Sequence, residues 1–133
     1  MNKPGAEDKA REAKRKEIVA EYKSQMEKSE TRLDELRAKN RGIEDCLDEI
    51  YTLHLSTKSI LTNHQSTHYQ YGSHKECELL QQVEEELNND YRIAETAFLD
   101  EQEEIKRERK KIFREREDIE SEYRYALLAL DEK

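Results

Sequence analysis

The chain has 133 residues, of which 42% are charged and 34% hydrophobic, with no Trp, one Pro and three Gly. This composition leaves too few apolar residues for a compact globular core. The net charge of −8 disfavours nucleic acid and acidic membranes as partners. The class that remains is one of long helices, each of which buries one apolar stripe and leaves its other faces in water.

The first predicted helix runs from about residue 6 to about residue 62, after a short lead in which Pro4 and Gly5 disfavour helix. An apolar stripe in steps of three and four residues marks one face of this helix, which is typical of a coiled coil. The stripe stays in phase across Gly42, so we expect the helix to continue there. Its positions are Val19, Tyr22, Met26, Ser29, Leu33, Leu36, Asn40, Ile43, Leu47 and Ile50.

A polar break follows at about residues 63–73, where the apolar periodicity stops. Gly72 precedes a capping box formed by Ser73 and Glu76, in which the serine hydroxyl accepts a hydrogen bond from the amide three residues later. We therefore expect a loop over 63–73 and a new helix from about residue 74.

The second predicted helix runs from about residue 74 to about residue 130 and carries its own stripe. Two helices of similar length that are joined by a short loop predict an all-α, antiparallel coiled-coil hairpin, and we expect one domain over 1–133. The stripe positions are Leu80, Val83, Leu87, Tyr91, Ala94, Phe98, Gln102, Ile105, Arg109, Ile112, Arg116, Ile119, Tyr123, Ala126 and Leu130.

Asn40, Arg109 and Arg116 lie at stripe positions where apolar residues are expected. With a fold-back at about residue 69, Arg109 is expected near Ser29, and Arg116 near Tyr22. One interpretation is that each arginine lays its stem along the stripe and extends its guanidinium into water. The other is that this end of the stripe is shared with a third helix that carries acidic residues.

Several kinds of chemistry have weak signals. Cys46 and Cys77 do not form a disulfide framework, and we expect both to be reduced. The cluster of His64, His68, His74 and Cys77 has metal-ligand residue types but no ligand motif, so a polar segment is favoured over a metal site.

Nucleic-acid binding and catalysis are also disfavoured. The basic run at 106–111 lacks interleaved aromatic residues and follows a segment, 84–104, with nine acids and one arginine. No nucleophile–base pattern or phosphate-binding loop is present, so we expect no enzymatic activity and no cofactor.

The second stripe is wider than a two-helix hairpin needs, because Phe113 and Leu127 lie beside it. A widened apolar face favours a second buried surface and hence a protein partner. The residues expected to bind that partner are Phe98, Ile105, Arg109, Ile112, Phe113, Arg116, Ile119, Tyr123 and Leu127.

Residues 98–127, FLDEQEEIKRERKKIFREREDIESEYRYAL, resemble the C-terminal helix of small proteins encoded beside LXG toxins of Gram-positive type VII secretion systems. The shared pattern is an aromatic residue, acids, a Lys/Arg-Glu run, and then tyrosines and leucines. The resemblance implies a WXG-like helical hairpin that serves as a targeting factor for the helical N-terminal domain of the toxin. A Tyr-x-x-x-Glu pair of the export-motif type lies at Tyr91 and Glu95, although chance alone predicts one or two such pairs.

Two other functions fit a hairpin of this size. One is the coiled-coil stalk or chaperone protein of a type III export apparatus, and the other is a structural coiled coil that forms a homodimer in isolation. The chain begins with polar residues and has no apolar run of membrane-spanning length. We therefore expect a cytoplasmic protein that can be exported together with its partner.

Overall fold

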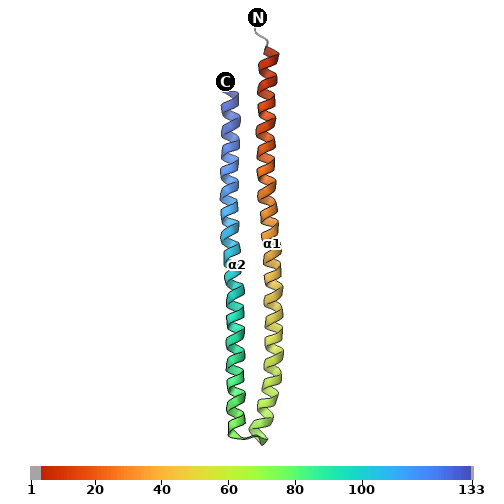
Figure 1. Cartoon of the computed structure of the whole chain (residues 1–133), viewed down its shortest axis with the longest axis vertical. Coiled ribbons are helices and arrows are strands. Elements are labelled where there is room, and N and C mark those ends of the chain that lie inside the picture. The colour runs from red at the N-terminus through yellow and green to blue at the C-terminus, as the bar shows by residue number, and fades with distance from the viewer. Residues whose placement is uncertain (1–3, 133) are drawn as a thin grey trace. The chain divides into compact units, whose positions relative to one another are not determined.

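A computed structural model describes residues 4–132, with side chains described for 5–67 and 72–132. Two helices account for nearly all of this part of the chain: α1 spans Pro4–Tyr71 and α2 spans His74–Asp131. They pack against each other as an all-α helical hairpin, which confirms the predicted fold class (Figure 1).

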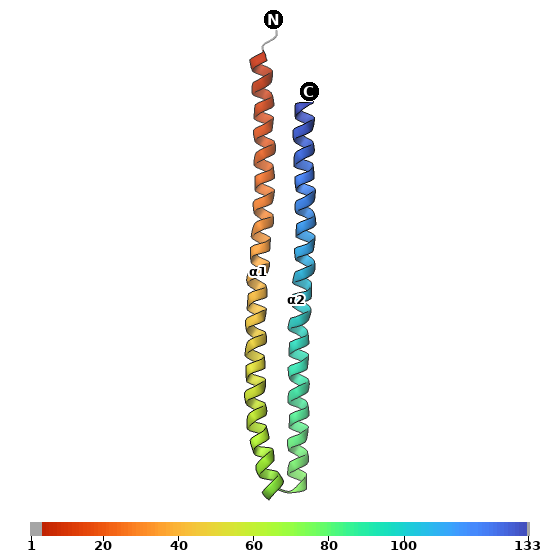
Figure 2. The ribbon, with the colours of Figure 1, turned by 180° about the vertical axis from the view of Figure 1, so that it is seen from behind.

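The hairpin divides into two compact units. Unit 1 consists of Met1–Ala38 and Lys106–Lys133, and unit 2 consists of Lys39–Ile105. In each unit, a segment of α1 lies antiparallel to a segment of α2, as the views from opposite sides show (Figures 1 and 2). Unit 2 also contains the connection between the helices, so it is a hairpin by itself.

The core of each unit is a line of side chains between the two helical segments. Leu33 and Ile112 are 1% and 0% exposed in unit 1, where Ser29 is buried beside them. In unit 2 the buried apolar residues are Ile43, Leu61 and Ile105. A line of buried side chains removes far less apolar area from water than a globular core does, because only one face of each helix is covered.

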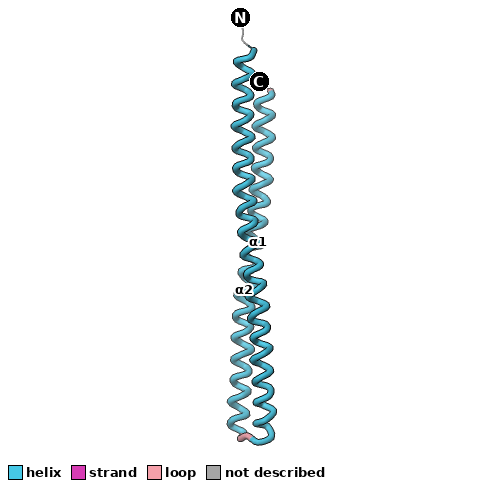
Figure 3. The backbone as a smooth tube through the Cα atoms, turned by 90° about the vertical axis from the view of Figure 1, so that its right-hand side faces the viewer, coloured by secondary structure: helices cyan, strands magenta, loops and turns pink. Residues whose placement is uncertain are grey.

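The predicted loop over 63–73 is wrong, because α1 continues to Tyr71 and only Gly72 and Ser73 connect the helices (Figure 3). The stripe does not end at Ile50. It continues through His54, Thr57, Leu61 and Gln65, each of which is buried or half-buried.

Polar groups also support this last part of α1. The Thr62 hydroxyl donates to the carbonyl of Lys58, and the Gln65 amide donates to Glu84 of α2 over 2.9 Å. Loss of apolar periodicity therefore marks a polar helix face rather than the end of the helix.

Both helix starts can be explained locally. The amide of Glu76 donates to Ser73 Oγ over 3.2 Å, which confirms the expected serine cap of α2. α1 begins at Pro4, two residues earlier than expected. Proline suits a first helical turn, because its φ is already helical and its missing N–H would have no partner there.

Helix α1 is continuous at Gly42, as the phase of the stripe predicts. A β-carbon added to Gly42 would meet no atom within 4 Å. The residue therefore faces open space, and its lack of a side chain is not required by packing.

The expected alignment of the helices is wrong by about one heptad. Tyr22 was expected opposite Arg116, but its ring stacks on Tyr123, with 4.2 Å between centroids and 16° between planes. Arg116 instead lies beside Glu30, with Nη1 3.0 Å from Oε2. Since the connection is shorter and later than predicted, the fold-back moves, and a seven-residue shift still brings stripe against stripe.

Candidate functional site

The predicted partner-binding residues of unit 1 divide into accessible and covered ones. Ile112 is fully buried against α1, so the hairpin itself covers this side chain. Phe113 is 43% exposed, so a large part of its side chain is accessible to water. Ile119, Tyr123 and Leu127 are half-buried, which leaves part of each side chain accessible.

The two predicted arginines behave differently. Arg116 lies at the stripe with its side chain 26% exposed, and its guanidinium pairs with Glu30 of α1. Arg109 is exposed and lies off the stripe, where Glu108 takes the half-buried position instead.

A surface ion-pair group joins the helices of unit 1 near these residues. Arg32 of α1 lies between two α2 carboxylates, 3.7 Å from Glu108 and 3.0 Å from Glu115. Because all three side chains are 40–46% exposed, each pair contributes little to stability, and the group acts mainly on helix alignment.

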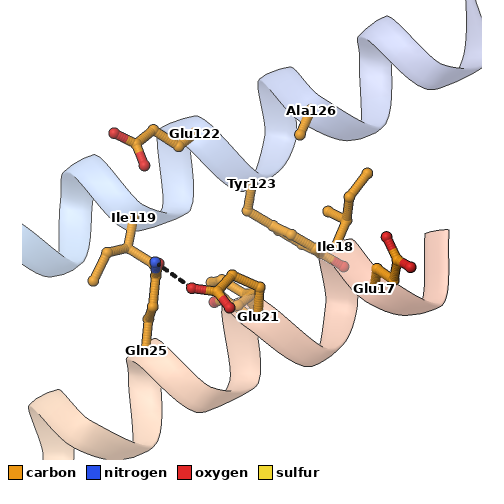
Figure 4. Close-up of a pocket in the computed structure, with 9 residues that line it drawn as sticks. Glu17, Ile18, Glu21, Gln25, Ile119, Glu122, Tyr123 and Ala126 are labelled. Atoms are coloured by element: carbon orange, nitrogen blue, oxygen red, sulfur yellow. Dashed lines mark hydrogen bonds between the residues drawn. The ribbon is translucent and has the colours of Figure 1, made fainter. Parts of the chain in front are cut away.

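The stacked tyrosines of unit 1 border a surface groove of about 420 Å³. Tyr123 reaches from α2 toward α1 in this groove (Figure 4). Three carboxylates stand around it, from Glu17, Glu21 and Glu122, and Glu21 accepts a hydrogen bond of 3.0 Å from Gln25 (Figure 4). The groove can hold an apolar side chain of a partner, provided that its neighbours are polar or basic.

Unit 2 holds the two remaining predicted residues. Ile105 is 4% exposed and belongs to the core, whereas Phe98 is half-buried. The nine predicted residues therefore do not form one continuous surface. Two of them, Ile105 and Ile112, are core positions of their units.

The exposed apolar surface is concentrated in unit 2, away from most of the predicted residues. Of the eleven large apolar side chains that are exposed in the described part of the chain, eight belong to unit 2. These eight are Tyr51, Leu53, Leu55, Ile60, Leu79, Val83, Ile93 and Leu99. The sequence carried a signal for the first four of them, since apolar residues are more frequent in 50–61 than one stripe needs.

A groove of about 250 Å³ runs between the helices of unit 2. Two residues that line this groove stack on each other: the rings of His54 and Tyr91 have 4.3 Å between their centroids. His54 Nδ1 is buried and has no hydrogen-bond partner among the described residues. The groove residues are Ile50, Leu53, His54 and Thr57 of α1 and Leu87, Asp90, Tyr91 and Ala94 of α2.

Tyr91 and Glu95, the Tyr-x-x-x-Glu pair, interact directly on α2. The tyrosine hydroxyl donates a hydrogen bond of 2.8 Å to Glu95 Oε2. This bond favours the neutral phenol, and together with partial burial and the nearby negative charge it raises the pKa of Tyr91 above its usual value.

The two units also differ in charge. By sequence, unit 2 has 15 acidic and five basic residues, a net charge of −10, whereas unit 1 has 17 acidic and 19 basic residues, a net charge of +2. The overall charge of −8 thus comes from the unit that carries most of the exposed apolar side chains. Such a surface favours partners that combine apolar and basic groups.

Sites of other kinds have little support in the described residues. No three His, Cys, Asp or Glu side chains converge there as a metal ion would require, and the His68 side chain lies outside that part. Cys46 and Cys77 are free thiols, as expected. Neither described helix is apolar enough over a sufficient length to span a bilayer.

Comparison of the chain with protein-family models, with curated proteins and with solved structures finds no match.

Proposed function

We propose that this protein is a non-enzymatic binding protein that packs its helices against the helices of another protein. The observation that carries this proposal is the set of eight large apolar side chains exposed on unit 2. Exposed apolar side chains concentrated in one part of a protein are a usual mark of a binding region. The groove of unit 2 and the separate groove of unit 1 both lie along helices and open to water, which suits side chains of a partner better than a reacting substrate.

The partner that we propose is the helical N-terminal domain of an LXG-type toxin, with this protein as its targeting factor for type VII export. Two observations support the choice: the likeness of residues 98–127 to the C-terminal helix of such factors, and the all-α hairpin, which can extend a bundle of helices. In this proposal the two proteins assemble in the cytoplasm, and the complex is presented to the secretion machinery.

Co-expression with the N-terminal domain of the toxin encoded by the adjacent gene tests this function. We expect the two proteins to co-purify at low salt and to elute together on size-exclusion chromatography. Failure to co-purify under these conditions would reject the toxin as partner.

Light scattering on the isolated protein provides the control for self-association. A monomer, or a dimer that dissociates when the toxin domain is added, agrees with the proposal. A stable homodimer that does not bind the toxin domain would favour a structural coiled coil instead.

A further inference from the structure

One side of unit 2 forms an apolar groove with exposed walls. Its floor holds Ile50 and Leu87, and one wall is Leu53, which is 67% exposed. Leu53 also borders a second depression along α1, which Asp48 and Glu49 help to line. The groove therefore opens to water beside carboxylates.

Helical spacing extends this groove toward the connection between α1 and α2. Ile60 lies two turns after Leu53 and shares its face of α1, and it is 60% exposed. On α2, Leu79 and Val83 precede the groove residue Leu87 in steps of four, so they continue the opposite wall. The result is two apolar rows in steps of four and seven, the spacing by which two helices receive a third.

Carboxylates border both rows. Asp90 lines the groove directly, and Glu86 lies one turn before it on the same face of α2. On α1, Glu49 lies one turn before Leu53. None of the eight residues that line the groove is Lys or Arg, and the whole unit has a net charge of −10.

We propose that this groove, between Leu53 and Ile60 on α1 and Leu79, Val83 and Asp90 on α2, binds a basic amphipathic helix of a partner protein. This inference rests on the proposed binding function and specifies where and how the partner docks. Apolar side chains of the partner, spaced i, i+3/i+4 and i+7, fill the groove, while its Lys and Arg face the carboxylates on both rims.

Charge decides against a second copy of this chain as the occupant. Two copies of unit 2 would bring net charges of −10 and −10 together across a narrow apolar strip. Like charges placed across an interface cost free energy and suppress the wrong pairing. A basic helix gains from the same field, both in affinity and in association rate.

The test measures binding of labelled peptides to the full chain by fluorescence anisotropy. The probe is a synthetic amphipathic helix of about 20 residues with leucines on one face and lysines elsewhere. Two peptides serve as controls: one with glutamate in place of every lysine, and a scrambled one of identical composition without an apolar face. We expect the basic amphipathic peptide to bind at least about tenfold more tightly than either control, and to weaken as salt is raised from about 50 to about 500 mM.

Variants of the chain locate the binding site. Leu53→Ser/Ile60→Ser should reduce affinity for the basic peptide at least about tenfold, and Asp90→Lys/Glu86→Lys should also reduce it. The matched control is Tyr125→Ser/Leu128→Ser, which removes two exposed apolar side chains of unit 1. Because all of these side chains are exposed and none belongs to the core, circular dichroism should show unchanged helix content in each variant.

Three results would overturn the inference. They are equal binding of the basic and scrambled peptides, undiminished binding by Leu53→Ser/Ile60→Ser, and a homodimer that this double substitution dissociates. The same variants separate this inference from the proposed function. If the toxin domain co-purifies with Leu53→Ser/Ile60→Ser as well as with the wild type, the function survives and the groove assignment fails.

Discussion

The side-chain amide of Gln102 donates a hydrogen bond of 3.3 Å to Asn40 Oδ1, from one helix of unit 2 to the other. Both residues occupy stripe positions, where apolar side chains are the rule, and both are half-buried. A hydrogen-bonded polar pair at facing stripe positions favours one alignment of the helices, because a shift of one helix along the other separates the two partners. The pair thus explains why the hairpin keeps one of several alignments that its stripes allow.

Replacing this pair by leucines tests its role in alignment. We expect Asn40→Leu/Gln102→Leu to raise the free energy of unfolding by about 1 kcal/mol or more, and with it the melting temperature, because two apolar side chains join the buried line. We also expect light scattering to detect a mixture of oligomers, because no polar pair then selects one helix alignment and one number of partners. A lower melting temperature with unchanged association would show that the pair contributes to stability rather than to alignment.

The stacked rings of Tyr22 and Tyr123 hold unit 1 together near its helix ends. A double-mutant cycle with Tyr22→Ala and Tyr123→Ala should give a coupling free energy of about 0.5–1.5 kcal/mol. Tyr123→Phe keeps the stack and should retain most of that coupling. Chemical denaturation measures all four proteins, and additive effects of the two alanine substitutions would contradict the contact.

Gly42 offers a stabilising substitution in the middle of α1. Gly42→Ala should raise the free energy of unfolding by about 1 kcal/mol, because alanine restricts the unfolded chain and is the better helix former. The space around the position is open, so no clash opposes the change. Thermal melts should show a rise of a few degrees, whereas no rise would imply that the helix is frayed or broken at this point.

His54 carries a buried nitrogen without a partner, a defect that a substitution can remove. His54→Phe keeps a flat ring against Tyr91 and eliminates the unsatisfied atom, so we expect stabilisation by about 1 kcal/mol. His64→Phe at an exposed position of the same helix is the matched control and should change stability little. Destabilisation by His54→Phe alone would indicate that Nδ1 is hydrogen-bonded in solution.

The hydrogen bond from Tyr91 to Glu95 predicts a pH dependence at alkaline pH. The folded-state pKa of Tyr91 is raised. Its stabilising contribution is therefore fully present below the unfolded pKa of about 10 and is lost as pH rises through the folded value. Stability should fall more steeply above pH 10 in the wild type than in Tyr91→Phe. NMR of labelled tyrosine rings should show that Glu95→Gln lowers this pKa, and identical titrations would contradict the bond.

The sequence carried enough information to predict the helices and their class, but not the extent of the first helix. Residues 62–71 contribute no apolar side chain to the stripe, yet they remain helical, and Gln65 still joins α2 through its hydrogen bond to Glu84. Periodicity reports which face is buried. It does not report where a polar helix ends, and here only Gly72 and Ser73 interrupt the helical pattern.

The candidate binding surface was also only partly predictable from the sequence. The sequence pointed to residues 98–127, where Phe113 is indeed exposed, but it included the core residues Ile105 and Ile112. It overlooked Leu53 and Ile60, because they lie off the first stripe and only the second stripe was interpreted as a widened apolar face. Exposure depends on what the other helix covers, which a one-dimensional pattern does not specify.

By itself, then, the sequence determined two antiparallel helices, a serine cap before α2, continuity at Gly42 and an acidic segment over 84–104. These properties depend on neighbouring residues or on the spacing of apolar residues along one helix. The tertiary structure decided that Tyr22 meets Tyr123 and that the open apolar face belongs to unit 2. A heptad stripe matches its partner equally well after a seven-residue shift, so only the length of the connection and the cross-helix contacts select one arrangement.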